Sequence, residues 1–320
     1  MSYNLDFEQE LAIEAETIRA LQQQNPDDAQ LQEAIDHLQA RTKDVYARLT
    51  SWQTVQVARH KDRPYAADYL KLMCEDFMEL HGDRAYGDDH AILAGLGQMG
   101  GRTMMFICQQ KGRDMAAKKY HNFGMPHPEG YRKAYRLMCQ AEKFQMPLIC
   151  LIDTPGAFPG LEDEEHGQSG AIAANLALMS RLRTPIISVV IGEGGSGGAL
   201  AISIADRLLM LEHSVYTVAA PEAAASILWR DKSFAPQAAE AMRISARELL
   251  STELIDGLVP EPVGGAHRNH CRAAGYLKDT LLSHLTELER YTPGELLELR
   301  YRKYRRIGPF VHLNENAIAC

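Results

Sequence analysis

The chain has 320 residues, of which 46% are hydrophobic and 24% are charged, a composition typical of a globular protein with one or two domains. Its formal net charge of −8 argues against a nucleic-acid-binding protein, which needs clustered basic side chains to contact phosphates. No signal peptide and no apolar run of about 18 residues is recognisable. We therefore expect a protein that neither follows that secretory route nor spans a membrane.

The cysteines predict neither a metal site nor a redox motif in this chain. The six are Cys74, Cys108, Cys139, Cys150, Cys271 and Cys320. None of them form a C-x-x-C pair, the usual spacing of zinc ligands and of redox-active thiols. Several lie in apolar runs, where free cysteine behaves as a small hydrophobic residue. This usage suits a reducing compartment, so we expect a cytoplasmic protein.

The first 50 residues predict two helices that form a hairpin appended to the rest of the protein. Either Pro26 or Asp27 begins the second helix. Apolar residues recur in it at three- and four-residue spacing, namely Leu31, Ile35, Leu38, Val45 and Leu49. Such an apolar stripe needs a partner, which is either the core or another chain.

From about residue 90 the pattern changes to repeated β-β-α units. Two apolar runs joined by glycines, 91–99 and 103–109, predict a β-hairpin. The further expected elements are, in chain order, a loop 111–128, a helix 129–144, a strand 148–152, a helix 164–181, a strand 186–191, a short helix 199–205, strands 208–211 and 215–218, and a mostly helical remainder from Pro221 to about 288. The last basic cluster is either a solvated helix end or a docking surface for an acidic partner, and comprises Arg300, Arg302, Lys303, Arg305 and Arg306.

Two glycine-rich turns, near 156–160 and 194–199, follow successive buried strands. Buried parallel strands of an α/β sheet place ligands at their carboxyl ends, so we expect the two turns to lie side by side at one site.

The second turn fits two motifs that depend on its side chains or its spacing. Gly192, Gly194 and Gly197 fit the dinucleotide pattern G-x-G-x-x-G, with Glu212 as the ribose-binding acid 20 residues after Gly192. The short following helix and the late position in the chain argue against this interpretation. A phosphate-binding P-loop is excluded, because Ala199 stands where that motif has lysine.

The same turn also fits G-x-S-x-G, the nucleophile elbow of serine hydrolases, with Ser196 as the nucleophile. Asp256 and His267 follow in the correct chain order but are separated by only 11 residues, and His213 is an alternative base. Five small residues match many patterns by chance, so this motif is only moderately specific.

A further interpretation uses the backbone alone. The N–H groups of Gly198 and Ala199 would form an oxyanion hole at a helix N-terminus, and the neighbouring glycines would let a substrate approach the main chain closely. A turn that serves packing only is the remaining alternative, although so many adjacent glycines lose backbone entropy without filling a core.

Several ordered motifs resemble one family. They are Gly82-Asp83-Arg84-Ala85-Tyr86, Gln110-Lys111-Gly112-Arg113, Asn122-Phe123-Gly124-Met125-Pro126, Asp153-Thr154-Pro155-Gly156-Ala157-Phe158-Pro159-Gly160, Gly192 to Ala199, Ser226-Ile227-Leu228-Trp229 and Gly264-Gly265-Ala266-His267-Arg268. Over about residues 50–290 the chain resembles the crotonase-like superfamily. More narrowly, it is similar to the alpha subunits of bacterial acetyl-CoA carboxylase carboxyltransferase. A longer, more basic tail and the loop at residues 231–232 depart from that pattern.

The resemblance implies an α/β crotonase-like domain of repeated β-β-α units at 61–290, with a helical extension at 1–60 and a basic tail at 291–320. It implies transfer of a carboxyl group from carboxybiotin, carried on a partner protein, to acetyl-CoA, giving malonyl-CoA for fatty acid synthesis. It also implies three partners and an α2β2 heterotetramer. The partners are a zinc-ribbon beta subunit, a biotin carboxyl carrier protein and biotin carboxylase.

Both substrates of such a transfer develop an oxyanion, which backbone N–H groups stabilise. We assign the biotin oxyanion to Gly198 and Ala199, and expect the beta chain to supply the second oxyanion hole. The other expected contacts are Gly156, Ala157 and Phe158 along the biotin channel and Gly194, Gly195 and Gly197 for close approach. Lys111 and Arg113 either face a CoA phosphate or the biotin carboxylate, or lie in a solvated loop. A bulky β-branched residue at Gly198 should abolish transfer without unfolding the protein.

Overall fold

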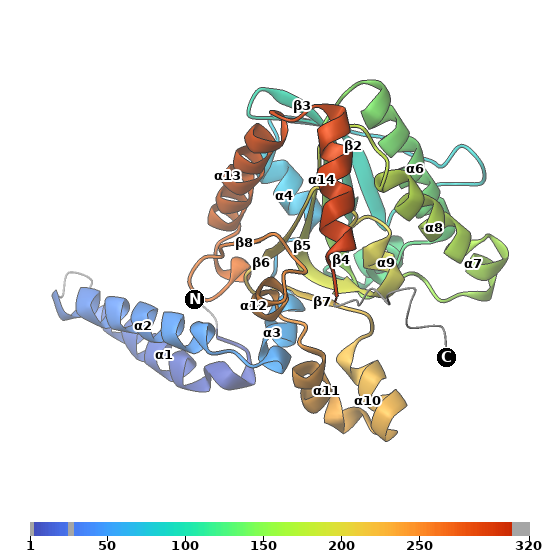
Figure 1. Ribbon diagram of the computed structural model, residues 1–320. Helices are drawn as coiled ribbons and strands as arrows, with labels where there is room; N and C mark the ends of the chain where they lie inside the picture. The colour runs from blue at the N-terminus through green and yellow to red at the C-terminus, as the bar shows by residue number, and fades with distance from the viewer. Residues whose placement is uncertain (1–2, 25–28, 309–320) are drawn as a thin grey trace, which may run out of the picture.

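The computed structural model describes residues 3–24 and 29–308, whose strands form one sheet (Figure 1). Its strands are β1 (Asp76–Glu79), β2 (Ile92–Met99), β3 (Arg102–Gln109), β4 (Leu148–Thr154), β5 (Ile186–Gly195), β6 (Arg207–Leu211), β7 (Val215–Thr217) and β8 (Gly257–Val259). They are ordered β1-β2-β3-β4-β5-β6-β8, with β7 paired to the end of β5. The first three strands are antiparallel, and the pairs from β3 to β8 are parallel. The expected hairpin is therefore confirmed as β2 and β3.

Helices cover both faces of the sheet and extend beyond it. The α-helices are α1 (Gln9–Gln24), α2 (Ala29–Ala47), α3 (Ser51–Ala58), α4 (Ala66–Met73), α5 (Met115–Tyr120), α6 (Pro128–Lys143), α7 (Leu161–Glu165), α8 (Gln168–Met179), α9 (Ser196–Leu200), α10 (Pro221–Trp229), α11 (Ala235–Met242), α12 (Ala246–Ser251), α13 (His270–Leu288) and α14 (Pro293–Arg305). The short 3-10 helices are η1 (Asp6–Glu8), η2 (Asn122–Gly124), η3 (Lys232–Phe234) and η4 (Ala266–Arg268). None of the helices in the described ranges is long and apolar enough to cross a membrane.

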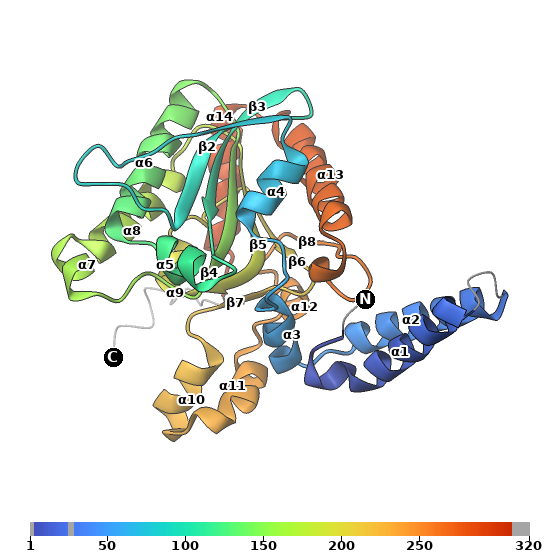
Figure 2. The ribbon, with the colours of Figure 1, turned by 180° about the vertical axis from the view of Figure 1, so that it is seen from behind.

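The central strands are buried on both faces because their successive side chains enter two different cores. Phe106 and Ile149 belong to the core that α4 and α13 cover, whereas Ile107 and Cys150 belong to the core under α6 and α8 (Figures 1 and 2). This is why strands such as 148–152 are continuous apolar runs in the sequence, the pattern of parallel strands covered on both sides.

The N-terminal helices α1 and α2 pack against each other and project from the body (Figure 1). Leu11, Ile18, Leu31 and Leu38 form the buried seam of this hairpin. The apolar stripe therefore finds its partner within the hairpin. Glu8 joins the hairpin to the body, since its carboxylate pairs with Arg268. The expected helix start at Pro26 or Asp27 lies outside the described residues, as does Cys320.

Several expected elements differ in the structure. The segment 111–128, expected to be a loop, contains α5, whose first turn is capped by the Asp114 side chain, and the short helix η2. The helix expected at 164–181 is interrupted at Gly167, whose φ of +82° is left-handed, and α7 and α8 flank this break. Strand β5 continues to Gly195 because its last residues pair with β7. Helix α9 consequently starts at Ser196, three residues before the expected start at 199. Strands β1 and β8 were not expected, because runs of four and three residues carry little periodicity.

The basic cluster near the C-terminus is neither fully solvated nor available to a partner in its entirety. Arg300 is buried, and its guanidinium binds both carboxylate oxygens of Asp206, with N–O distances of 2.9 and 2.8 Å. Lys303 Nζ lies 2.5 Å from Asp256 Oδ2. Asp206 and Asp256 directly precede β6 and β8, so Arg300 and Lys303 dock α14 beside the amino ends of those strands. The tail beyond residue 308 lies outside the described residues.

A buried ion pair holds the carboxyl end of β5 in place. Both guanidinium Nη atoms of Arg63 bind Glu261, at 2.9 and 2.6 Å, while Arg63 Nε donates to the carbonyl of Ile191 at 2.8 Å. Glu261 also accepts hydrogen bonds from the backbone N–H groups of His213 and Ala266. Burial alone would raise the pKa of Glu261, but Arg63 and these donors outweigh it and lower the pKa to about 2.

We predict that Glu261→Gln costs about 3–5 kcal/mol of folding free energy at neutral pH, because it leaves the Arg63 charge buried without its partner. The pKa of Glu261 is lower in the folded than in the unfolded chain, so its contribution is complete above about pH 5 and is lost as the pH falls toward the folded pKa. Urea denaturation of the original chain and of Glu261→Gln should show that the difference between their free energies of unfolding shrinks as the pH falls below about 5. Glu212→Gln, at the more exposed pair with Arg247, is the control and should cost about 1 kcal/mol or less. A difference that is constant with pH would contradict the prediction.

Candidate active site at the two glycine turns

The turns that follow β4 and β5 lie backbone to backbone. The two strands are adjacent and parallel, and Thr154 pairs with Gly194 after an irregularity in the register. A Cβ atom on Gly195 would lie 2.2 Å from the carbonyl oxygen of Pro155, and one on Gly198 would lie 2.5 Å from the nitrogen of Ala157. The expectation that the two turns lie side by side is thus confirmed, and glycine is required at both positions.

Helix α9 begins inside this contact. Gly195 is its N-cap, Ser196 is its first residue with a left-handed φ of +55°, and Gly198 is its third residue. The N–H groups in the first turn of a helix have no partner within the helix. Gly198 and the following Ala199 are both buried, whereas Ser196 is exposed. The early helix start therefore places the N–H groups of Ser196 and Gly197 in the same first turn as that of Gly198.

Gln109, at the end of β3, connects the end of β4 to the second turn through hydrogen bonds of its side-chain amide. Its amide Nε2 donates to the carbonyl of Gly198 at 2.8 Å, and its Oε1 accepts from the backbone N–H of Asp153 at 3.2 Å. The side chain is fully buried, so both bonds are shielded from water. Gln109 could not be identified from the sequence, because a single glutamine at the end of an apolar strand belongs to no recognisable motif.

Lys111 is largely buried and paired with two carboxylates. Its Nζ lies 2.7 Å from Asp153 Oδ1 and 3.6 Å from Glu193 Oε2, and the same Asp153 oxygen accepts from the N–H of Glu193 at 3.0 Å. Burial alone would lower the pKa of Lys111, but these carboxylates outweigh it and raise the pKa above its ordinary value. Lys111 is therefore not part of a solvated loop.

Arg59, just after α3, completes this network of charges. Its guanidinium lies 2.5 Å from Glu193 Oε1 and 2.6 Å from Glu222 Oε1. Burial alone would raise the pKa of Glu193, but Lys111 and Arg59 lower it, so the carboxylate stays ionised beneath the second turn. Glu193 is thus buried and ion-paired, because its place near the end of β5 brings its carboxylate close to Lys111 and Arg59.

A basic pocket of about 280 Å³ opens beside Lys111. Arg113 lines it too, but this side chain is held by Asp68 at 2.6 Å and by the ring of Tyr65, whose centroid lies 4.8 Å from the guanidinium carbon. The lining residues are Ala58, Arg59, Lys61, Tyr65, Lys111, Gly112, Arg113, Lys118 and Phe123. Five of these nine are lysine or arginine, and three of the five, Arg59, Lys111 and Arg113, are paired with carboxylates. The lining is therefore basic in composition, with its positive charge partly neutralised.

The first turn carries an apolar side chain on a fixed backbone. Phe158 packs against His127, with ring centroids 4.5 Å apart, and its N–H donates to the carbonyl of Pro126 at 3.0 Å. Gln168 Nε2 donates to the carbonyls of both Pro126 and Phe158, each at 3.0 Å. His127 is in turn paired with Asp163. This arrangement sets the position of Phe158 relative to Gly156.

The side-chain interpretations of the second turn find no support in the geometry. Gly192 and Gly194 lie within β5, not in a turn, and Glu212 is paired with Arg247 at 2.7 Å. Asp256 binds the N–H of Leu208 and Lys303. No hydrogen bond among the described residues joins Asp256, His267 and Ser196 into a triad.

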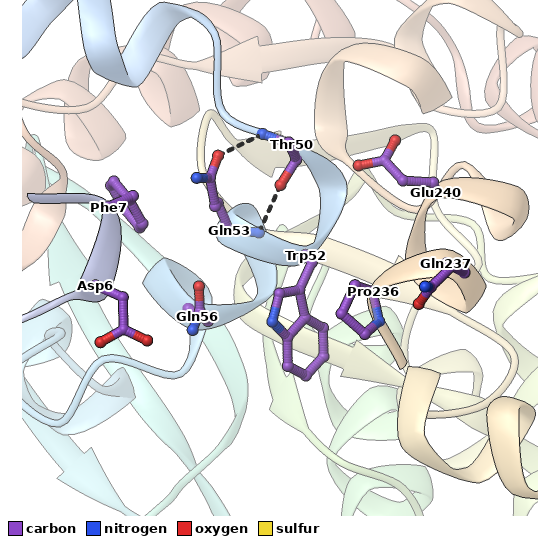
Figure 3. A pocket seen from close by; sticks show the side chains of 9 residues that line it. All are labelled: Asp6, Phe7, Thr50, Trp52, Gln53, Gln56, Pro236, Gln237 and Glu240. Carbon is purple, nitrogen blue, oxygen red and sulfur yellow. Dashed lines mark hydrogen bonds between the residues drawn. The ribbon is translucent and has the colours of Figure 1, made fainter. Parts of the chain in front are cut away.

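The proposed bases of such a triad are engaged elsewhere. His267 stacks on His60 with ring centroids 4.0 Å apart, and burial, followed by the charges of neighbouring cations, lowers its pKa to about 2. His213 is buried against Tyr46, and burial lowers its pKa as well. A different pocket, of about 420 Å³, lies where η1, α3 and α11 meet (Figure 3). None of its lining residues belongs to the two glycine turns.

Comparisons with known proteins agree with this geometry. Residues 4–308 match the family model described as "Acetyl co-enzyme A carboxylase carboxyltransferase-like". The acetyl-coenzyme A carboxylase carboxyl transferase subunit alpha of Heliobacterium modesticaldum is 51% identical over 325 aligned residues, which cover 99% of this chain and 96% of that protein.

Two solved structures resemble the fold at low sequence identity. The transcarboxylase 12S core superposes with a TM-score of 0.54 at 19% identity, over 67% of this chain and 41% of that one. A chain of a Pseudomonas malonate decarboxylase hetero-tetramer gives 0.56 at 19% identity, over 69% of this chain and 91% of that one. These similarities confirm the crotonase-like α/β fold expected from the sequence.

The close contact of the turns corrects the expectation that a β-branched residue at Gly198 leaves the fold intact, because any Cβ there meets backbone atoms of Gly156 and Ala157. We predict that Gly198→Ala lowers the free energy of unfolding by about 1–3 kcal/mol through this overpacking. Gly197 lies in the same helix, and its Cβ would meet only Ile172 Cδ1 at 3.8 Å. Gly197→Ala should therefore change stability by no more than about 0.5 kcal/mol. Chemical denaturation checks both, and equal effects would contradict the proposed contact.

Proposed function

The chain belongs to the family of acetyl-coenzyme A carboxylase carboxyltransferase alpha subunits, and from this premise we propose how its own residues perform the transfer. As such a subunit, it contributes to moving a carboxyl group from carboxybiotin, held on a carrier protein, to acetyl-CoA, giving malonyl-CoA for fatty acid synthesis. The observation that carries the assignment of the site is the contact between the two glycine turns, with the buried Gly198 in the first turn of α9.

The backbone around Gly198 fits a flat, anionic group. Carboxybiotin supplies an activated carboxyl group, and its departure leaves negative charge on the ureido oxygen. We propose that the N–H groups of Gly198 and Ala199 donate to this oxygen, with the positive end of α9 behind them. Of the three glycines expected to permit a close approach, only Gly197 faces open space, where a Cβ would meet Ile172 Cδ1 at 3.8 Å. A Cβ on Gly194 would meet the ring of Tyr216 and one on Gly195 would meet the backbone of Pro155, so these two glycines are needed for packing within the chain. No side chain is required as a base, because the basic ureido group can accept the methyl proton of acetyl-CoA.

The first turn is proposed to form the wall of the biotin channel. Gly156 has a φ of +155°, which favours glycine, and a Cβ there would meet only Ser196 at 3.8 Å, so the turn is open on that side. Ala157 and Phe158 then present small and aromatic apolar surface beside the second turn. Such surface excludes water and strengthens hydrogen bonds to a developing oxyanion.

We propose that the basic pocket attracts the anionic part of a substrate. Arg113 is held on its rim by Asp68 and Tyr65, and Lys111 lies at its inner end. Either a CoA phosphate or the carboxylate of carboxybiotin has the charge that this pocket favours. Lys111 also neutralises Asp153 and Glu193, which would otherwise repel the oxyanion near Gly198.

The remaining part of the proposal concerns partners. A zinc-ribbon beta subunit would supply the second oxyanion hole, for the thioester oxygen of acetyl-CoA. A biotin carboxyl carrier protein and biotin carboxylase would deliver the carboxyl group to an α2β2 heterotetramer in the cytoplasm. This chain offers one set of main-chain donors at its glycine turns, whereas the reaction develops two oxyanions, and this difference supports the need for a second subunit.

The first prediction from this proposal is that activity requires two subunits. Carboxyl transfer in the reverse direction, from malonyl-CoA to a biotin derivative, should occur when this chain is mixed with the beta subunit and should be absent with either alone. Loss of malonyl-CoA is the measured quantity. Turnover by this chain alone at the rate of the mixture would contradict the proposal.

A second prediction tests the channel wall. Phe158→Ala removes an apolar contact that biotin makes equally in the bound ground state and in the transition state. KM for the biotin derivative should therefore rise roughly 5–30-fold with little change in kcat. Phe144→Ala, at an exposed residue beyond the end of α6, is the matched control and should leave both constants unchanged. An unchanged KM in Phe158→Ala would exclude Phe158 from the channel.

A further inference from the structure

Two histidines and an aspartate converge in the connection between β1 and β2, which lies beside α6 (Figure 2). His81, Asp88 and His90 each offer one ligand atom, and these three atoms lie within 4.8 Å of one another. His81 Nδ1 is 2.9 Å from Asp88 Oδ2, and His90 Nδ1 is 3.9 Å from the same oxygen. Glu79 Oε1 is 3.7 Å from His81 Nδ1 and adds a second carboxylate.

The spacing of these atoms matches the edges of a small coordination tetrahedron. Zinc binds histidine nitrogen and carboxylate oxygen at about 2.0–2.2 Å, which separates neighbouring ligand atoms by about 3.3–3.5 Å. The three separations given above, 2.9, 3.7 and 3.9 Å, lie on either side of that value. The ligand atoms of His81, Asp88 and His90 all lie within 4.8 Å of one another, and the exposed side chains of His81 and Asp88 have room to adjust around an ion. Glu79 is near enough to His81 to join them by a side-chain rotation.

The central carboxylate is already oriented toward the histidines. Asp88 Oδ1 accepts from the N–H of Gly82 at 2.8 Å and from Lys133 Nζ at 2.6 Å, which leaves Oδ2 directed at the cluster. Lys133 is fully buried in α6 and therefore holds this geometry firmly. Fixed outer partners of this kind are what orient the ligands of metal sites.

His90 is also held in place by residues at the end of α5. Its ring stacks on Tyr120 of α5, with centroids 4.1 Å apart, and its carbonyl oxygen lies 2.6 Å from the ring Nδ1 of His121. The cluster thus joins residues anchored to three elements, namely the end of β1, the N-terminus of β2 and the C-terminal end of α5.

We propose that His81, Asp88 and His90, with Glu79 as the fourth ligand, bind one divalent ion of the zinc class and so clamp this connection to α5 and α6. Two imidazoles favour zinc, cobalt, nickel or copper over magnesium and calcium, which prefer all-oxygen sites. The absence of paired cysteines from the sequence does not bear on this site, because it contains no thiolate. The inference is independent of the carboxyl transfer proposed above.

Isothermal titration of the full chain, freed of metal by a chelator, with zinc chloride tests the proposal. We expect one ion per chain, and we expect His81→Ala and His90→Ala each to weaken binding by at least about tenfold. His37→Ala, at an exposed histidine paired with Glu14, is the matched control and should bind as the original chain does. No saturable binding, or equal loss in all three variants, would overturn the proposal.

Cobalt provides a second measurement that needs no variant. Cobalt(II) in a site of two nitrogen and two oxygen ligands with four-coordinate geometry should give strong visible d–d absorption, and zinc should abolish it by competition. Weak absorption typical of a six-coordinate ion, or absorption that excess zinc leaves unchanged, would also overturn the assignment. Neither readout depends on the activity of the assembled enzyme.

Discussion

The contact on which the rest of the site depends is the one between the backbones of two glycine-containing stretches, 155–157 and 195–198. These stretches approach so closely that a single added Cβ atom at Gly195 or Gly198 would meet main-chain atoms at 2.2–2.5 Å. Such an approach is possible only because β4 and β5 are adjacent parallel strands that end at the same edge of the sheet. It places the N–H groups at the start of α9 at this edge, and thus favours chemistry in which the main chain stabilises negative charge.

Polar and charged side chains hold this backbone in place. Gln109, Lys111 and Asp153 lie on the β3 and β4 side, while Glu193, Arg59 and Arg63 fix the end of β5. Asp153 and Glu193 each have a cationic partner, so the negative charge close to the proposed oxyanion site is neutralised before any substrate binds. We infer that these ions serve catalysis by positioning the backbone, which fits the lack of a histidine or carboxylate poised as a base in the two turns.

The β1–β2 connection is linked to the proposed channel through one residue. Asp89, next to Asp88 of the histidine cluster, accepts hydrogen bonds from Asn122 Nδ2 at 2.7 Å and from the N–H of His127 at 2.8 Å. His127 packs against Phe158 of the first glycine turn. An ion that rigidified this connection would therefore also restrain Phe158, through Asp89 and His127. The ion would stabilise the channel wall without lying in the channel.

The buried strands, the two turns and the family could be predicted from the residues alone, because apolar runs, glycine spacing and long ordered motifs are local properties of the chain. The adjacency of the turns followed from the rule that buried parallel strands end at the same edge of a sheet. The sequence could not determine that β5 continues to Gly195, since that depends on pairing with β7, twenty residues further on. It could not place Gln109, the Lys111 ion pairs or the buried Arg300, nor bring Glu79, His81, Asp88 and His90 together. These are contacts between side chains whose direction is fixed only after strands and helices pack, so tertiary structure alone decided them.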